Sequence, residues 1–318
     1  MPASSRQPAT LRTDEDRAAP AVELIAALVA VSEGEPRILT IRDGDALPSG
    51  PLQTAHRSLQ AGLREQVERQ THHPLGYLEQ LYTFADRDRA IGVPQHVISI
   101  SYLGLTREGP VSGDWDASWR GWYGYFPWED RRAASPSWYP EMIRRVKSWA
   151  QDAPDIATRR QRRQRSAMAF GLDGSGWNED LVLQRYELLY EAGLVPEAGK
   201  QGNAGWTAPG TPMAQDHRRI LATAIARLRA KIKYRPIVFE LMPERFTLLQ
   251  LQRTVEALAG QALHKQNFRR LVEQQNLVEE TGQTSTETGG RPAMLFRFRR
   301  NVLLERAVAG TKLPLARS

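Results

Sequence analysis

Residues 50–72, GPLQTAHRSLQAGLREQVERQTH, constrain the fold of this chain more than any other stretch. Leu59, Leu63 and Val67 recur every four residues, which predicts the buried stripe of an amphipathic helix. Side chains three and four positions apart share one face of a helix. The opposite face therefore gathers four charged side chains, Arg64, Glu65, Glu68 and Arg69.

The segments on either side of this helix predict strands. Residues 21–42 contain two apolar runs around a turn at residues 32–36, and residues 96–105 form a strongly β-branched run. Residues 77–90 are expected to connect the helix to that last strand. The predicted order is therefore hairpin, helix, connecting segment and strand, within a chain of the α+β class.

The spacing from Gly50 to Glu68 is similar to that of the Nudix box. That box has Gly, five residues, Glu, seven residues, Arg-Glu, an apolar residue, any residue and Glu-Glu, and it closes with a Gly. Four positions depart from it, because His56 replaces the first Glu, Gln66 an apolar residue, Arg69 the last Glu and Thr71 the closing Gly. The resemblance implies a Nudix-like α/β/α sandwich.

Among the four departures from the Nudix box, those at His56 and Arg69 remove carboxylates that a catalytic metal ion would need. Magnesium needs oxygen ligands, and in a hydrolase it polarises the diphosphate and activates water. A cation at position 69 opposes divalent-metal binding and favours phosphate. We therefore expect no catalytic residues and no metal site, but a domain that senses a nucleotide. The resemblance implies an effector such as ADP-ribose or another NAD-related nucleotide, with ATP as a further candidate, and no required cofactor. The residues expected to bind the effector are Arg64, Glu65, Glu68, Arg69, Asp86 and Arg87.

A second pattern lies at the other end of the chain. Residues 216–300 resemble the winged helix-turn-helix tail of the NrtR-type family, the Nudix-related transcription regulators of NAD metabolism. The family's motifs have counterparts at Asp216–His217, Tyr234–Pro236, Phe246–Leu248, Asn267–Arg270 and Gly290–Ala293. Residues 78–89, LEQLYTFADRDR, resemble the same family.

The tail predicts a DNA-reading pair of helices. The first, with Thr247 as N-cap, has Leu248, Leu251, Val255 and Leu258 on its apolar face, and Gly260 lies in the following turn at residues 259–262. The second, at about 264–275, would bury Phe268, Leu271 and Val272. The residues expected to bind DNA are Lys265, Gln266, Asn267, Arg269 and Arg270, together with Arg291 in the wing.

These side chains suit different parts of a duplex. Arg reads guanine and Gln or Asn reads adenine, so Gln266, Asn267 and Arg270 are expected at base edges and Lys265 and Arg269 at phosphates. Arg291 is expected to reach a minor groove or a phosphate. The alternative is a solvated helix face. Wing carboxylates such as Glu279 and Glu280 would repel DNA if they faced it.

The charge distribution favours the DNA-binding hypothesis. Residues 216–306 hold 17 Lys/Arg against 9 Asp/Glu, while the whole chain carries a net charge of +7. The basic surplus therefore lies in the C-terminal part. The chain has no cysteine and no long apolar run, which fits a cytoplasmic protein with no membrane partner.

The middle of the chain, residues 106–215, matches the family poorly. Its aromatic concentration at residues 115–128 fits a core or dimer interface better than a ligand contact. Five arginines at 159–165 favour a solvated helix or loop face, with phosphate or DNA contact as the alternative. Residues 177–195 predict one helix, and residues 196–213 a flexible linker or long loop. The length of this region resembles the NadQ-like alphaproteobacterial branch of the family.

The sequence predicts four parts. They are a disordered tail at 1–20, a Nudix-like effector-binding domain at 21–215 with an insertion at 131–214, a connector helix with the winged helix-turn-helix domain at 216–306, and a tail at 307–318. The resemblance implies a homodimeric repressor of NAD synthesis or salvage genes, and two-fold symmetry would predict a palindromic operator. Two alternatives remain: an active ADP-ribose or NADH diphosphatase in which Asp86 or Asp88 completes the metal site, and a nucleotide-binding adaptor with no DNA role.

Overall fold

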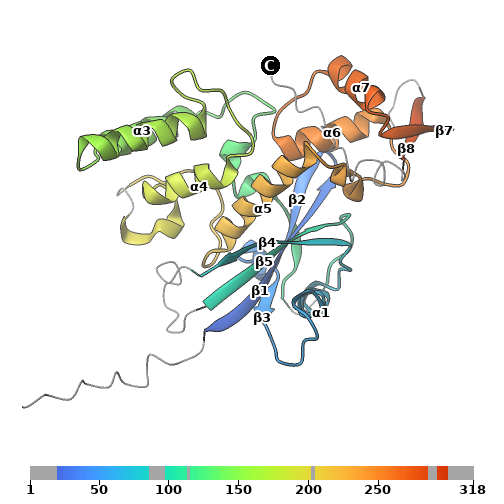
Figure 1. Ribbon diagram of the computed structural model, residues 1–318, viewed down its shortest axis with the longest axis horizontal. Coiled ribbons are helices and arrows are strands. Elements are labelled where there is room, and N and C mark those ends of the chain that lie inside the picture. The colour runs from blue at the N-terminus through green and yellow to red at the C-terminus, as the bar shows by residue number, and fades with distance from the viewer. Residues whose placement is uncertain (1–19, 86–96, 113–114, 202–204, 286–291, 300–318) are drawn as a thin grey trace, which may run out of the picture.

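The computed structural model describes residues 20–85, 97–112, 115–201, 205–285 and 292–299. One mixed sheet has the strand order β4-β5-β1-β2-β6, with β3 also paired to β1 (Figure 1). β1 and β5 are parallel and the other neighbours are antiparallel. The strands are β1 (Ala21–Ser32), β2 (Glu35–Thr40), β3 (Ser49–Pro51), β4 (Tyr77–Phe84), β5 (Val97–Leu105) and β6 (Ser118–Gly121).

The central strand β1 explains why the sheet is covered on both faces. Successive side chains of a strand point to opposite faces, and those of residues 24–30 are 0–1% exposed on either side. Leu24, Ala26 and Leu28 pack in one cluster with α1 (Leu59–Thr71), through Leu63 and Val67. The opposite face, with Ile25, Ala27 and Val29, packs in a second cluster that includes α5 (His217–Ile232). The domain is therefore an α/β/α sandwich.

The structure confirms the predicted hairpin, the helix after it and the strand β5. Residues 77–84, which we expected to be a connecting segment, form the strand β4 instead. β4 is an edge strand whose side chains are mostly half-buried or exposed, so it lacks the apolar alternation that marks a strand in sequence.

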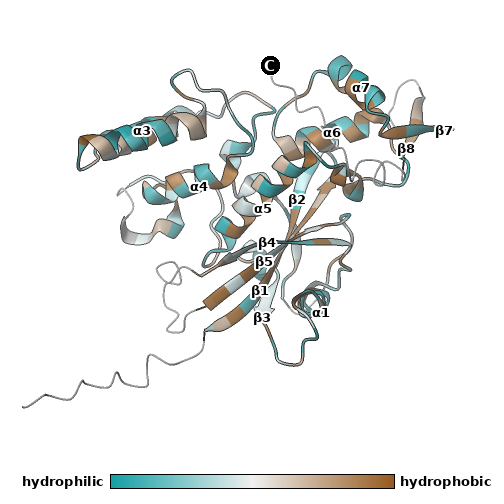
Figure 2. Ribbon diagram, viewed as in Figure 1, coloured by the Kyte–Doolittle hydropathy of each residue, from teal (hydrophilic) through white to brown (hydrophobic). Residues whose placement is uncertain are grey.

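Three further helices pack in series against α5, on the side away from α7 (Lys265–Gln274), as Figure 1 shows. They are α2 (Tyr139–Gln151), α3 (Ile156–Phe170) and α4 (Val182–Glu191), with short 3-10 turns η2 (Arg42–Gly44), η4 (Trp122–Gly124), η5 (Pro127–Glu129) and η6 (Pro196–Gln201). Trp122, Phe126 and Trp128 are 0–1% exposed, so these members of the aromatic concentration are core residues. In Figure 2, α3 is mostly hydrophilic along its length, whereas the strands of the sheet carry long hydrophobic stretches.

Residues 205–213 form a packed loop, which is the long loop and not the flexible linker among the two alternatives that the sequence left open. Ala208 and Met213 are buried, and the Ala208 amide donates to the Leu194 carbonyl. The Thr211 amide donates to the Gly124 carbonyl at 2.9 Å. These contacts hold the loop against the core, which Gly and Pro content alone does not reveal.

The C-terminal domain is a winged helix that shares its core with the sandwich. It consists of η7 (Ile237–Leu241), α6 (Leu248–Ala259), α7 (Lys265–Gln274), β7 (Val278–Ser285) and β8 (Ala293–Phe298). Its buried residues belong to the same cluster as the α5 face of the sheet. α5 contacts β1, β4 and β5 on one side and α6 on the other, so it joins the two parts physically. Within the described residues, no helix has the length and apolar character needed to cross a membrane.

Candidate nucleic-acid and nucleotide sites

The first helix of the helix-turn-helix begins at a capping box. The Gln250 amide donates to the Thr247 hydroxyl at 3.1 Å, and the Thr247 amide donates to the Gln250 side chain at 2.7 Å. Thr247 is thus the N-cap that the sequence predicts. Leu251, Val255 and Leu258 are fully buried, which confirms the predicted apolar face.

The second helix, α7, presents a polar face to solvent. Phe268 and Val272 are 1% and 0% exposed and anchor it, whereas Leu271, which we expected to be buried, is only half-buried. His264 occupies the N-cap position without a side-chain cap bond. The predicted DNA-contacting residues on this helix are all exposed: Lys265, Gln266, Asn267, Arg269 and Arg270. The arrangement brings three cations and two amides onto one short helix, and their DNA contacts stay a prediction.

The wing is fixed to the helices by backbone hydrogen bonds. Phe246 and Phe296 exchange amide–carbonyl bonds of 3.0 and 2.8 Å, which ties β8 to the start of α6. Glu279, whose charge we expected to disfavour DNA, accepts a bond from Arg297 at 2.6 Å and is partly neutralised. Arg291 lies outside the described residues.

The charged face of α1 is the candidate nucleotide site. Glu65, Glu68 and Arg69 are exposed on it, as the helical spacing predicts. Arg64 donates to the Leu75 carbonyl at 2.6 Å and to the Gly76 carbonyl at 3.1 Å. Arg64 therefore orients the segment that leads from α1 into β4. Asp86, Arg87 and Asp88 lie outside the described residues.

The residues that depart from the Nudix box have structural partners. Gln66 donates to the Pro51 carbonyl at 2.6 Å, and Gln70 donates to the Ser49 carbonyl at 2.7 Å, so two buried glutamines bind α1 to β3. The His56 ring accepts a bond from the Gln53 amide at 3.1 Å and lies 3.8 Å from the Glu65 carboxylate. These contacts hold α1 against β3, although the helix lacks several residues of the Nudix box.

The described residues of the box offer few ligands for a magnesium ion. Only Glu65 and Glu68 remain of the carboxylates, and Arg69 adds a cation beside them. Magnesium requires several oxygen ligands in near-octahedral geometry. In the part of the chain that the structure describes, no group of three or more His, Asp or Glu side chains is placed to hold a metal ion.

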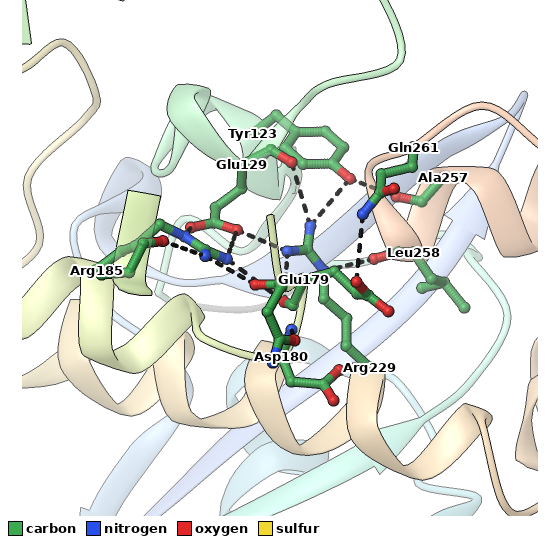
Figure 3. A network of polar contacts seen from close by, with 11 residues as sticks. Tyr123, Glu129, Glu179, Asp180, Arg185, Arg229, Ala257, Leu258 and Gln261 are labelled. Carbon is green, nitrogen blue, oxygen red and sulfur yellow. Dashed lines mark hydrogen bonds and ion pairs between the residues drawn. The ribbon is translucent and has the colours of Figure 1, made fainter. Parts of the chain in front are cut away.

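A buried network of charges lies where the sandwich meets the helix-turn-helix (Figure 3). Glu129 of η5 accepts from Arg185 of α4 at 2.5 and 2.7 Å and from Arg229 of α5 at 2.6 Å. All three side chains are 0–1% exposed. Burial alone would raise the pKa of Glu129, but the two guanidiniums outweigh it and lower the pKa. The carboxylate is thus held ionised between two helices.

The same network holds the C-terminal end of α6, where the turn to α7 begins. Arg229 donates to the Leu258 carbonyl at 2.8 Å, and the Tyr123 hydroxyl donates to the Ala257 carbonyl at 2.6 Å. Gly260 caps α6 with a φ of +70°. A Cβ on Gly260 would lie 2.3 Å from the Glu129 carbonyl oxygen. The backbone of the turn therefore touches the network directly.

Sequence reasoning did not single out this network, although one signal was present. Arg229 lies in phase with the buried Ile225 and Ile232 of α5, and Arg185 lies between the buried Val182 and Tyr186 of α4. A charge at an apolar position of a helix indicates a buried partner. The sequence does not reveal which carboxylate that partner is.

Comparisons with known proteins identify the C-terminal fold. Residues 238–298 match the family model of the NrtR DNA-binding winged helix domain. The ADPR responsive transcriptional repressor NtrR of Acinetobacter baylyi is 43% identical over 86 residues. That match covers 27% of this chain and 34% of the relative, so the chain spans about a third of that relative's length.

Solved structures extend the likeness in fold to more than nine-tenths of the chain. Shewanella oneidensis NrtR complexed with a 27mer DNA has a TM-score of 0.53 at 20% identity, over 92% of this chain and 99% of that one. A MutT/nudix family protein from Enterococcus faecalis has a TM-score of 0.51 at 16% identity, over 93% and 90% of the two chains. The fold is a Nudix-like α/β domain followed by a winged helix, as in the NrtR structure.

Proposed function

We propose that this chain, with the fold of NrtR and a winged helix of the NrtR type, is a transcriptional repressor of genes for NAD synthesis or salvage. The observation that carries the proposal is the exposure of the polar face of α7. Its polar and basic side chains face solvent while Phe268 and Val272 anchor it in the core. A recognition helix needs this arrangement, because its exposed N-terminal residues must enter a major groove.

The proposed DNA contacts divide by chemistry. Gln266, Asn267 and Arg270 read base edges, and Lys265 and Arg269 bind phosphates. Arg291 binds a phosphate or the minor groove from the wing. Two copies of the chain form a homodimer on a palindromic operator, with half-sites about one helical turn apart or a multiple of it.

The proposed effector is ADP-ribose, with other NAD-related nucleotides and ATP as further candidates. Support comes from the Acinetobacter baylyi repressor, which is named ADPR responsive, and from the Nudix-like fold. The effector binds the charged face of α1 through Arg64, Glu65, Glu68 and Arg69, completed by Asp86 and Arg87. Arg69 supplies a cation for a phosphate. The chain acts as a sensor and not as a hydrolase.

The route from effector to DNA runs through α5 and the buried network. α5 packs on the sheet opposite α1, and its Arg229 touches both Glu129 and the backbone of the helix-turn-helix. A ligand shifts an equilibrium only by its differential affinity for the two states. Binding at α1 must therefore favour one orientation of the winged helix over another.

The helical insertion supports a narrower assignment within the NrtR type. Residues 139–191 add α2, α3 and α4 beyond the sheet and its two covering helices. We propose that the chain represents the longer NadQ-like branch and retains the division into a Nudix-like part at 21–215 and a connector helix with the winged helix at 216–306.

DNA binding is tested by selecting duplexes from a randomised library with the full-length protein. We expect a palindromic site, and Arg270→Ala should weaken binding to it by about 1–3 kcal/mol, the contribution of a bidentate base contact. Arg107→Ala, at an exposed arginine outside the winged helix, is the control and should leave affinity unchanged. Selection of no preferred duplex, or equal affinities for both variants, would contradict the proposal.

The competing function, a diphosphatase, is favoured by one observation. Glu65 and Glu68 remain together on the exposed face of α1. Incubation with magnesium and ADP-ribose, followed by measurement of AMP release, separates the two functions. Turnover at or above about 1 per second that disappears in Glu68→Gln would overturn the sensor assignment.

A further inference from the structure

Helix α3 carries a charge pattern that the winged helix and the α1 face do not explain. Its five arginines lie between positions 159 and 165, and its N-cap is Asp155, which accepts from the Thr158 amide at 2.8 Å. The side chains buried on this helix are Ser166, Ala169 and Phe170, all near its C-terminal end. The N-terminal half of α3 therefore projects from the molecule with little packing of its own.

Two of the five arginines have partners. Arg165 is paired with Glu191 at 2.5 Å. Arg162 lies 4.3 Å from the centre of the Trp149 ring and donates to the Trp149 carbonyl at 3.2 Å. These contacts fasten the inner side of α3 to α2 and α4.

The other three arginines have no ion pair among the described residues. Arg159, Arg160 and Arg163 are exposed, and Arg163 lies four positions after Arg159 and three after Arg160, on one face. Like charges at this spacing repel one another in a helix. They border an open groove of about 350 Å³ lined by Ile156, Arg159, Arg160, Arg163, Gln164, Ala167 and Asp173. The face is thus an unneutralised cationic surface that a polyanion would complement.

The position of this surface favours duplex DNA as the polyanion. In Figure 1, α3 and α7 lie along the same edge of the molecule, and α1 lies toward the opposite edge. A duplex bound at α7 and continuing along this edge would pass α3. The planar guanidinium binds phosphate oxygens with two parallel hydrogen bonds, so arginine suits a phosphate backbone.

We propose that the Arg159, Arg160 and Arg163 face of α3 is a second DNA-binding surface, which binds backbone phosphates flanking the half-site read by α7. The inference rests on the proposed DNA-binding function and adds a contact outside the winged helix. Phosphate contacts carry no sequence information. The α3 face therefore strengthens binding to any sequence of sufficient length and leaves the choice of operator to α7.

The test compares two duplexes and two double variants. One duplex holds only the operator, and the other extends it by one helical turn on each side. Arg160→Gln with Arg163→Gln removes two unpaired cations from α3, and Arg57→Gln with Arg107→Gln removes two exposed cations elsewhere. Affinities are measured between 50 and 200 mM salt, and thermal unfolding checks that each variant is folded.

On the long duplex, the α3 variant should lower the slope of log affinity against log salt by about 1.8, at roughly 0.9 for each phosphate contact. Its affinity should then fall about 12-fold less than wild type across that salt range. On the short duplex it should match wild type, and the control variant should match wild type on both.

An unchanged slope on the long duplex, while wild type still selects its operator, would overturn the α3 inference alone. The same result with loss of the dimer in size-exclusion chromatography would assign the arginines to a protein interface, which also overturns it. If wild type binds neither duplex, the proposed function fails together with the inference.

Discussion

Three arginines are completely buried, and one of them, Arg229, bonds to both the sandwich and the helix-turn-helix. Arg185, Arg218 and Arg229 are each 0% exposed. Charges withdrawn from water are tolerated only with well-placed partners, and here Glu129 serves two of them and Glu197 serves Arg218. Each arginine also donates to backbone carbonyls, so removing one carboxylate leaves cations that cannot reach water.

Glu129→Gln should therefore destabilise the fold severely. The substitution keeps the shape of the side chain but leaves two buried guanidiniums without an anion, which costs about 3–5 kcal/mol. Urea unfolding measures the loss. Glu141→Gln is the matched control, because Glu141 pairs with two arginines at the surface and its loss should change stability little. Equal losses in the two variants would contradict the role of burial.

His217 makes stability depend on pH. It is buried at the start of α5, and its Nδ1 accepts a bond from the Leu47 amide at 3.1 Å. Burial, with a smaller effect of the Arg42 charge, lowers the pKa of His217 to about 4. The unfolded chain, with an ordinary pKa near 6.5, takes up the proton first as pH falls.

The free energy of unfolding should consequently decrease by roughly 3 kcal/mol between about pH 6.5 and pH 4, from about 1.4 kcal/mol per unit of pKa shift. Urea melts at several pH values measure this, and His217→Gln separates it from the titration of carboxylates. The variant keeps an acceptor for the Leu47 amide but no titrating group, so its pH profile should be flatter by that amount. Parallel profiles would refute the assignment.

At the scale of elements, the turn between α6 and α7 has two separate requirements. Its Gly260 adopts a left-handed conformation, and a side chain at this position would collide with Glu129, Arg229 and Tyr123. The first requirement is common to many helix ends. The second arises only because the turn is docked on the sandwich.

Gly260→Ala and Gly34→Ala separate the two requirements. Both glycines have positive φ, +70° and +75°, but a Cβ on Gly34 meets nothing within 4 Å. The strain of a left-handed alanine, about 1–2 kcal/mol, should appear in both variants. Gly260→Ala should lose more stability than Gly34→Ala, and its DNA affinity should also change because the turn must shift. Identical unfolding free energies would show that the docking contact is unimportant.

The elements that the sequence predicts are those with local signals. α6 and α7 are predicted within a few residues because capping at Thr247, apolar spacing and Gly260 are all local features. α3 has no apolar period, because its polar side chains surround it. β4 lacks alternation because it is an edge strand.

The candidate sites also divide into those with a local sequence signal and those without one. The exposed faces of α1 and α7 follow from helical spacing, so their residues could be named in advance. The buried network could not, because Glu129 lies 56 positions from Arg185 and 100 from Arg229. Contacts of that separation are set by the tertiary fold and leave no local pattern.

At the scale of the molecule, the winged helix is not an independent appendage. It shares one hydrophobic core with the sandwich, and Arg229 of the buried network donates a hydrogen bond to the end of α6. The orientation of α7 is therefore fixed by the same contacts that hold α5 on the sheet. A nucleotide bound at α1 changes DNA affinity only if the protein has two arrangements of these contacts and binds the nucleotide more tightly in one of them.

DNA affinity with and without nucleotide tests this account most directly. The measurement is fluorescence anisotropy of a labelled operator duplex titrated with the full-length protein, in the absence and presence of saturating ADP-ribose. We predict sequence-specific binding whose Kd changes about 5- to 150-fold with the nucleotide, corresponding to about 1–3 kcal/mol of coupling. A Kd that ADP-ribose, NAD and ATP all leave unchanged, or no binding to duplex DNA at all, would contradict it.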